Sequence, residues 1–90
     1  MPILKVPTPL CSYTAGNAEI RVQAATAGAA MQDLVRQYPG LQTHLYNSRG
    51  ELRPFVNLFL GELNVRDLQG LGTPLKDGDT LRLVPAVAGG

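Results

Sequence analysis

Only one long stretch of the chain has the apolar spacing of a helix. Its apolar residues follow the pattern i, i+3, i+4, i+7: Met31, Leu34, Val35 and Tyr38. Thr26 is a suitable N-cap, and Pro39-Gly40 ends the pattern, so we predict a helix over residues 27–38. The polar residues between them are expected on the opposite, solvated side: Gln32, Asp33, Arg36 and Gln37. We therefore expect the apolar side of this helix to be part of the core.

Strand patterns surround the predicted helix. Five segments are predicted to be strands: residues 3–6, 18–23, 53–60, 63–65 and 80–84. The second alternates most cleanly, with Ala18, Ile20 and Val22 on its apolar side. Two hairpins joined by one crossover helix, with the first and last strands parallel and central, make an α+β protein. We therefore predict a β-grasp with a mixed four- to five-stranded sheet and one main helix.

The connections after the helix are less regular. Residues 41–46 are ambiguous, and a short helical turn would tuck Leu41 and Leu45 under the sheet. Residues 66–75 have no clear period, and we expect Leu71 and Leu75 to close the end of the core.

The strand predicted over residues 53–60 is apolar on both faces. Val56, Leu58 and Leu60 share one face, and Phe55, Asn57 and Phe59 share the other. Because one helix covers only one face of a sheet, Phe55 or Phe59 is expected to contribute to an exposed apolar surface that a partner uses. The alternative is that residues 41–53 cover this face.

The last predicted strand runs directly into a tail of small residues. Pro85 removes a backbone donor and should end the ladder, and only Ala, Val and Gly follow it. We therefore expect a domain over residues 1–86 and a flexible tail over 87–90. The α-carboxylate of Gly90 has no Cβ beside it, so such a tail could enter a narrow catalytic channel where another enzyme activates it as an acyl-adenylate.

Several motifs resemble one known family. They are Val6-Pro7-Thr8, Phe55-Val56-Asn57, Val65-Arg66, Asp77-Gly78-Asp79 and the ending Val84-Pro85-Ala86-Val87-Ala88-Gly89-Gly90. Together they cover most of the chain and resemble the ubiquitin-like sulfur carriers of the MoaD/ThiS group, above all the sulfur carrier type of cysteine biosynthesis. The resemblance implies the same β-grasp fold.

The resemblance also implies a function. The glycine at position 90, preceded by Gly89, would be adenylated by a ubiquitin-activating-type enzyme that uses ATP, and would then carry sulfur as a thiocarboxylate. The residues implied in partner binding are Phe55, Phe59, Arg82, Val84, Pro85, Val87 and Ala88. The sulfur acceptor would be a pyridoxal-phosphate cysteine synthase or the large subunit of molybdopterin synthase, and no cofactor would be bound by the carrier itself.

Three other functions stay open at this point. The chain could be the small subunit of molybdopterin synthase, a protein modifier joined to lysines, or a binding module whose tail does nothing. The modifier is less favoured because ubiquitin has arginines in its tail, whereas Ala86, Val87 and Ala88 are uncharged.

The body of the chain offers little chemistry of its own. His44 is the single histidine and is expected on the surface, and Cys11 has no evident base beside it. The net charge of +1 gives no electrostatic reason for binding nucleic acid or a membrane. One cysteine and no signal or membrane segment indicate a cytoplasmic protein. We therefore expect a carrier that is a substrate of enzymes and not an enzyme itself.

Overall fold

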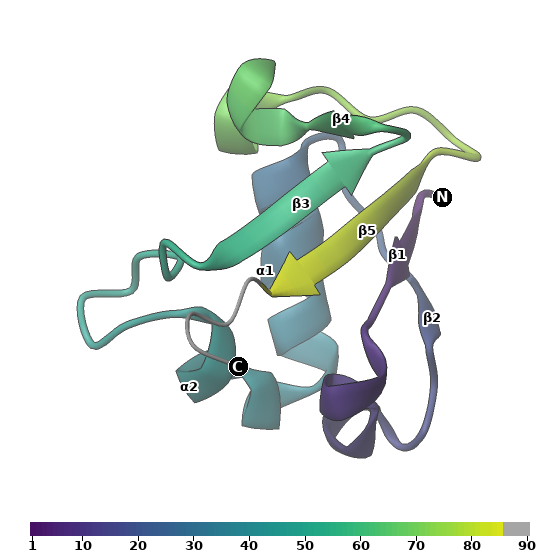
Figure 1. Cartoon of the computed structure of the whole chain (residues 1–90). Helices are drawn as coiled ribbons and strands as arrows, with labels where there is room; N and C mark the ends of the chain where they lie inside the picture. Colours follow the sequence, from purple (N-terminus) through teal and green to yellow (C-terminus); the bar gives the residue numbers. More distant parts are fainter. Residues whose placement is uncertain (86–90) are drawn as a thin grey trace.

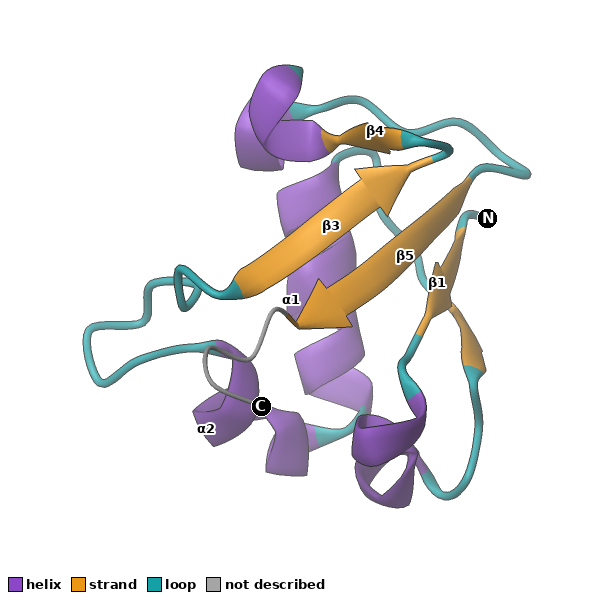
Figure 2. Ribbon diagram, viewed as in Figure 1, coloured by secondary structure: helices purple, strands orange, loops and turns teal. Residues whose placement is uncertain are grey.

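The computed structural model describes residues 1–85, in which one main helix packs against a five-stranded sheet (Figures 1 and 2). The strands are β1 (Ile3–Lys5), β2 (Glu19–Arg21), β3 (Val56–Leu60), β4 (Leu63–Asn64) and β5 (Thr80–Pro85). The helices are α1 (Ala27–Gln37) and the short α2 (Gln42–Leu45). Short 3₁₀ turns occupy Thr8–Thr14, Pro39–Leu41, Val65–Asp67 and Gly70–Gly72. No helix within residues 1–85 has the length and apolar composition needed to cross a bilayer.

The strand order is β2-β1-β5-β3-β4, and β1 and β5 are parallel neighbours at the centre. The other three pairings are antiparallel. This confirms the predicted β-grasp, with the first and last strands parallel and central. Thr26 caps α1 as predicted, since its hydroxyl accepts a hydrogen bond from the N–H of Ala29 at 3.2 Å.

The bounds of all five strands differ from the predicted ranges, and the differences in β3 and β5 concern the region of the site. β3 begins at Val56 and not at residue 53, because Pro54 and Phe55 form a turn that closes with a hydrogen bond from the N–H of Val56 to the carbonyl of Arg53. β5 continues through Pro85, which lies opposite Val56 in the register. A proline is tolerated there because it is the last residue of the strand and no further ladder bond requires its missing N–H. Ala18 lies outside β2 and is exposed.

The core lies between α1 and the facing side of the sheet. Its fully buried members include Leu4, Leu34, Leu58, Leu81 and Leu83. Leu41 and Leu45 are buried beside them, which confirms that the segment after α1 folds under the sheet.

The far end of the core is closed differently from the prediction. Leu75 packs partly buried against the core, as expected, but Leu71 is 44% exposed. Leu71 lies in the 3₁₀ turn between Gly70 and Gly72, and Gly70 has a positive φ of 60° that turns the chain outward there. Val65 and Thr73 are buried at this end instead, each 3% exposed.

Asp33 is buried, not solvated as the helical pattern predicted; it is 8% exposed. Its carboxylate accepts hydrogen bonds from the backbone N–H of Gln23 at 3.0 Å, from Arg36 Nε at 2.9 Å and from Gln37 Nε2 at 2.9 Å. The bond to Gln23 ties α1 to the chain that follows β2. Desolvation raises the pKa of Asp33, but the hydrogen bonds from Gln23, Arg36 and Gln37 and the positive charge of Arg36 outweigh it, so the pKa lies below its ordinary value.

Replacing Asp33 should therefore weaken the fold in a pH-dependent way. A lowered pKa adds stability that is fully present above the unfolded-state value of about 3.9 and is lost as the pH falls through the folded-state value. Asp33→Ala should reduce the free energy of unfolding by about 1–2 kcal/mol at neutral pH, because it leaves the N–H of Gln23 without this acceptor. Urea unfolding should be measured from neutral to acid pH. The difference in the free energy of unfolding between wild type and Asp33→Ala should become smaller in acid. The control is Gln32→Ala, at an exposed neighbour on α1, whose stability difference from wild type should not depend on pH. If the stability difference between Asp33→Ala and wild type were equal at every pH, a lowered pKa of Asp33 would be contradicted.

Candidate functional site

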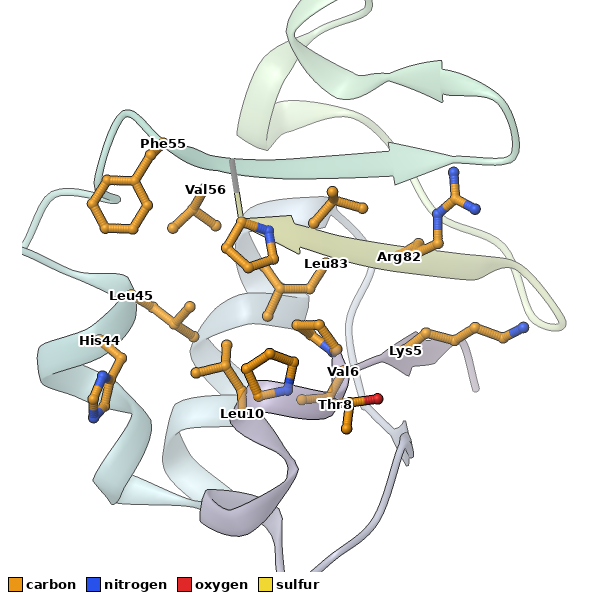
Figure 3. Close-up of a pocket in the computed structure, with 14 residues that line it drawn as sticks. Lys5, Val6, Thr8, Leu10, His44, Leu45, Phe55, Val56, Arg82 and Leu83 are labelled. Carbon is orange, nitrogen blue, oxygen red and sulfur yellow. The ribbon is translucent and has the colours of Figure 1, made fainter. Parts of the chain in front are cut away.

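The candidate site is a cavity of about 670 Å³ beside the end of β5 (Figure 3). Four segments form its walls: the end of β5, the chain after β1, α2, and the turn before β3. Leu83, Val84 and Pro85 line it from β5, so the last described residue of the strand lies at this cavity. A chain that continues from Pro85 therefore starts next to a largely apolar hollow.

Two prolines open this cavity. β1 pairs with β5 only as far as Lys5, which lies opposite Arg82. Pro7 and Pro9 lack the N–H groups that would extend the parallel ladder, and the chain turns instead into the 3₁₀ segment Thr8–Thr14. The end of β5 therefore has β3 on one side and no paired strand on the other. Leu10 lines the cavity on this unpaired side.

α2 forms the opposite wall. Leu45 is buried beneath the cavity, whereas His44 is exposed at its edge, as predicted for a surface residue. The His44 ring lies against the Tyr13 ring with centroids 4.3 Å apart. The sequence patterns assigned neither Leu10 nor His44 to the site.

Phe55 lies in the turn before β3, at the mouth of the cavity and 40% exposed. Figure 3 shows its ring above His44 and Leu45, on the same side as Val56. This position agrees with the apolar surface expected at Phe55, and its use by a partner stays a prediction. Residues 41–53 leave Phe55 40% exposed, while their side chains Leu45, Tyr46 and Leu52 pack on the core.

Phe59 is separated from this cavity. It lies half-buried on the sheet face that turns away from α1, opposite Arg82 in the register. The guanidinium carbon of Arg82 lies 5.4 Å from the centroid of the Phe59 ring, within cation–π range. The structure thus brings Phe55, Arg82, Val84 and Pro85 together at the cavity and places Phe59 beside Arg82 on the sheet. Val87, Ala88, Gly89 and Gly90 lie outside the described residues.

The ionisable side chains at the described cavity wall are Lys5, His44 and Arg82, so the wall carries basic groups and no carboxylate. Lys5 and Arg82 are neighbours on the same sheet face. A partner surface with carboxylates next to an apolar side chain would complement this arrangement.

The described part of the chain shows little catalytic equipment of its own. The Cys11 thiol is partly buried and points at the carbonyl oxygens of Val6 and Pro7, at 3.6 and 3.5 Å. Residues 1–85 hold no group of three or more His, Cys, Asp or Glu side chains placed to share a metal ion. The feature that this site presents is a largely apolar cavity beside the end of β5.

Known proteins are similar to this chain in sequence and in fold. The ThiS family matches residues 5–90. The sulfur carrier protein CysO of Mycobacterium tuberculosis strain H37Rv is 37% identical over 97% of this chain and 96% of its own. The structure matches the crystal structure of the Amycolatopsis orientalis BexX/CysO complex with a TM-score of 0.87 at 32% identity, over 100% of both chains. It matches the crystal structure of the small archaeal modifier SAMP1 of Haloferax volcanii with a TM-score of 0.84 at 30% identity, over 99% and 98% of the two chains. The chain thus belongs to the ThiS family, the group that its sequence motifs indicated.

Proposed function

We propose that this protein is a sulfur carrier whose Gly90 carboxylate is converted to a thiocarboxylate, most directly for the synthesis of cysteine. The observation that carries the proposal is the match to the ThiS family over residues 5–90 together with the CysO relatives, which cover nearly the whole chain. The fold supports it, because the central strand β5 leads the chain to Pro85 at the edge of an exposed cavity.

The chemistry needs two steps, and the reagents come from outside the carrier. In the first, a carboxylate oxygen of Gly90 attacks the α-phosphorus of ATP, forming an acyl-adenylate and releasing pyrophosphate. In the second, a hydrosulfide sulfur attacks the acyl carbon, so a C–S bond forms, the C–O bond to AMP breaks and AMP leaves. Loss of the sulfur-bound proton to water then gives the thiocarboxylate. Glycine suits both steps because no side chain shields its carbonyl.

The cavity is proposed to dock the activating enzyme while residues 86–90 reach its active site. Five residues span at most about 17 Å. The catalytic centre of the partner must therefore lie within this distance of Pro85 when the partner contacts Phe55 and Arg82. One relative in the matched structures was crystallised as a complex with another protein, BexX, which supports a role in which partners bind this fold.

The decisive measurement is an intact mass. The protein is incubated with ATP, a sulfur source and a ubiquitin-activating-type enzyme from the same organism. Replacement of one oxygen by one sulfur is the expected result, and omission of ATP should prevent it. An unchanged mass with an enzyme shown to be active on another carrier would refute the proposal. Transfer of the sulfur to activated serine on a pyridoxal-phosphate enzyme then tests the destination.

The second candidate is a protein modifier. The observation that favours it is the similarity to small archaeal modifier protein 1 of Haloferax volcanii, 34% identical over 84% of this chain. The two functions share the adenylation step and differ in what attacks the acyl carbon, a sulfur or the amine of a lysine. Adducts found by mass spectrometry as isopeptides on lysines of other proteins would support the modifier function.

A further inference from the structure

Arg66 makes an unusual contact with the turn that presents Phe55. Its Nη2 donates hydrogen bonds to the carbonyl oxygen of Pro54 at 2.6 Å and to that of Val56 at 3.2 Å. These two carbonyls flank Phe55 on both sides. Arg66 itself does not belong to the described wall of the cavity, so it approaches the turn from outside the docking surface.

The fold leaves these carbonyls available to Arg66. β4 pairs with β3 only at Phe59 and Leu60, so on that side the beginning of β3 has no strand beside it. A guanidinium is a strong multiple donor and can occupy the place that a neighbouring strand would otherwise take.

Arg66 is held in position by the residues just before it. Asn64 accepts a hydrogen bond from the N–H of Arg66 at 2.9 Å, and its own amide donates to Asn57 of β3 at 3.3 Å. Val65 is buried in the core with 3% exposure. The Arg66 side chain therefore starts from a fixed backbone and reaches across to the turn.

A second arginine fixes the other end of the same turn. Arg53 donates from Nε at 3.2 Å and from Nη2 at 2.9 Å to the carbonyl oxygen of Thr43 in α2. The turn before β3 is thus tied to the α2 wall of the cavity by Arg53 and to the chain after β4 by Arg66.

We propose that Arg66 is a positioning residue, which fixes the backbone on both sides of Phe55 so that the ring stays at the mouth of the cavity for docking of the activating enzyme. This inference rests on the proposed function. It assigns Arg66 an effect on partner recognition although its side chain lies outside the docking surface. An exposed aromatic ring binds better when its conformation is fixed in advance, because less conformational entropy is lost on binding.

The test is a double-mutant cycle on the loading reaction, with Arg66→Met, Phe55→Ala and the double variant as carriers for the activating enzyme. Arg66→Met should raise KM for the carrier by about fivefold with kcat unchanged, a change of the size expected when one ordinary hydrogen bond is lost. In the Phe55→Ala background the same substitution should have no effect on KM, because the ring that Arg66 positions is absent. Arg49→Met is the matched control: Arg49 is exposed, and its guanidinium has no hydrogen-bond partner within residues 1–85.

Arg66→Lys provides a second perturbation in case Arg66→Met fails to fold. It keeps the charge and gives up the planar fork, so its smaller rise in KM should likewise vanish in the Phe55→Ala background. The inference is overturned if folded Arg66 variants leave KM unchanged, or raise it equally with and without Phe55. A wild-type carrier that is never loaded would instead overturn the proposed function, so the two failures are distinguishable.

Discussion

Deleting Gly90 is expected to abolish sulfur loading and to leave the fold unchanged. The deletion leaves a carboxylate on Gly89, but this group lies one residue short, about 3.3 Å, of the place that the activating enzyme serves. Displacements of about 1 Å already cost on the order of a hundredfold in enzymatic rate, so the shorter carrier should show no detectable change in intact mass. The described core is formed by residues between Leu4 and Leu83 and loses no member.

Two controls separate chemistry from folding in this experiment. Thermal unfolding of the deletion variant should match wild type within about 0.5 kcal/mol, the range of surface changes that touch no core or cap. A carrier extended by one extra glycine should also fail to load, because its carboxylate lies one residue too far. Loading of the deletion variant at the wild-type rate would contradict the assignment of Gly90, and a large loss of stability would contradict the separation of tail and domain.

The elements that sequence could predict are those whose signal is local. The stripe of Met31, Leu34, Val35 and Tyr38 identifies α1 because residues that share one side of a helix recur at a fixed spacing. Strands before and after a single helix then leave few ways to build one sheet, and the predicted parallel pairing of β1 and β5 is confirmed.

The features that sequence could not predict depend on contacts between distant segments. Asp33 belongs to the polar side of α1, yet it is buried because the backbone of Gln23 happens to present an N–H to it. Leu71 is apolar like the core residues, but it is 44% exposed in a 3₁₀ turn that begins at Gly70, whose φ is positive. No local sequence pattern predicts the burial of Asp33 or the exposure of Leu71.

The cavity illustrates the same limit at the functional site. Phe55 could be chosen from sequence because the strand predicted over residues 53–60 is apolar on both faces and one helix covers only one of them. Val84 and Pro85 could be chosen because they end the strand that leads to the tail. Leu10 and His44 could not be chosen from sequence. Leu10 is brought to the cavity by the 3₁₀ turn after β1, and His44 is brought there by α2. A signal was present in Pro7 and Pro9: prolines that end a central strand leave the neighbouring strand unpaired at that point.

Replacing Phe55 is the second change with a large expected effect. Phe55→Ala should lower kcat/KM for loading by about tenfold to a hundredfold, because aromatic anchors in partly enclosed positions contribute the most to protein interfaces. The loss should fall on KM, since Phe55 is far along the chain from the reacting carbonyl and binds substrate and transition state alike. Steady-state kinetics with the activating enzyme and varied carrier concentration measure both kcat and KM.

Leu68→Ala is the matched control for Phe55→Ala. Leu68 is 41% exposed and Phe55 is 40% exposed, but Leu68 follows the 3₁₀ turn after β4 and lies outside the described cavity wall. Both variants remove a similar exposed apolar side chain, so both should change stability little. If loading tolerates Phe55→Ala and fails with Phe59→Ala, the partner docks on the sheet face beside Arg82 and not at the cavity. Because Arg82 borders both surfaces, only the two phenylalanines can separate these docking modes.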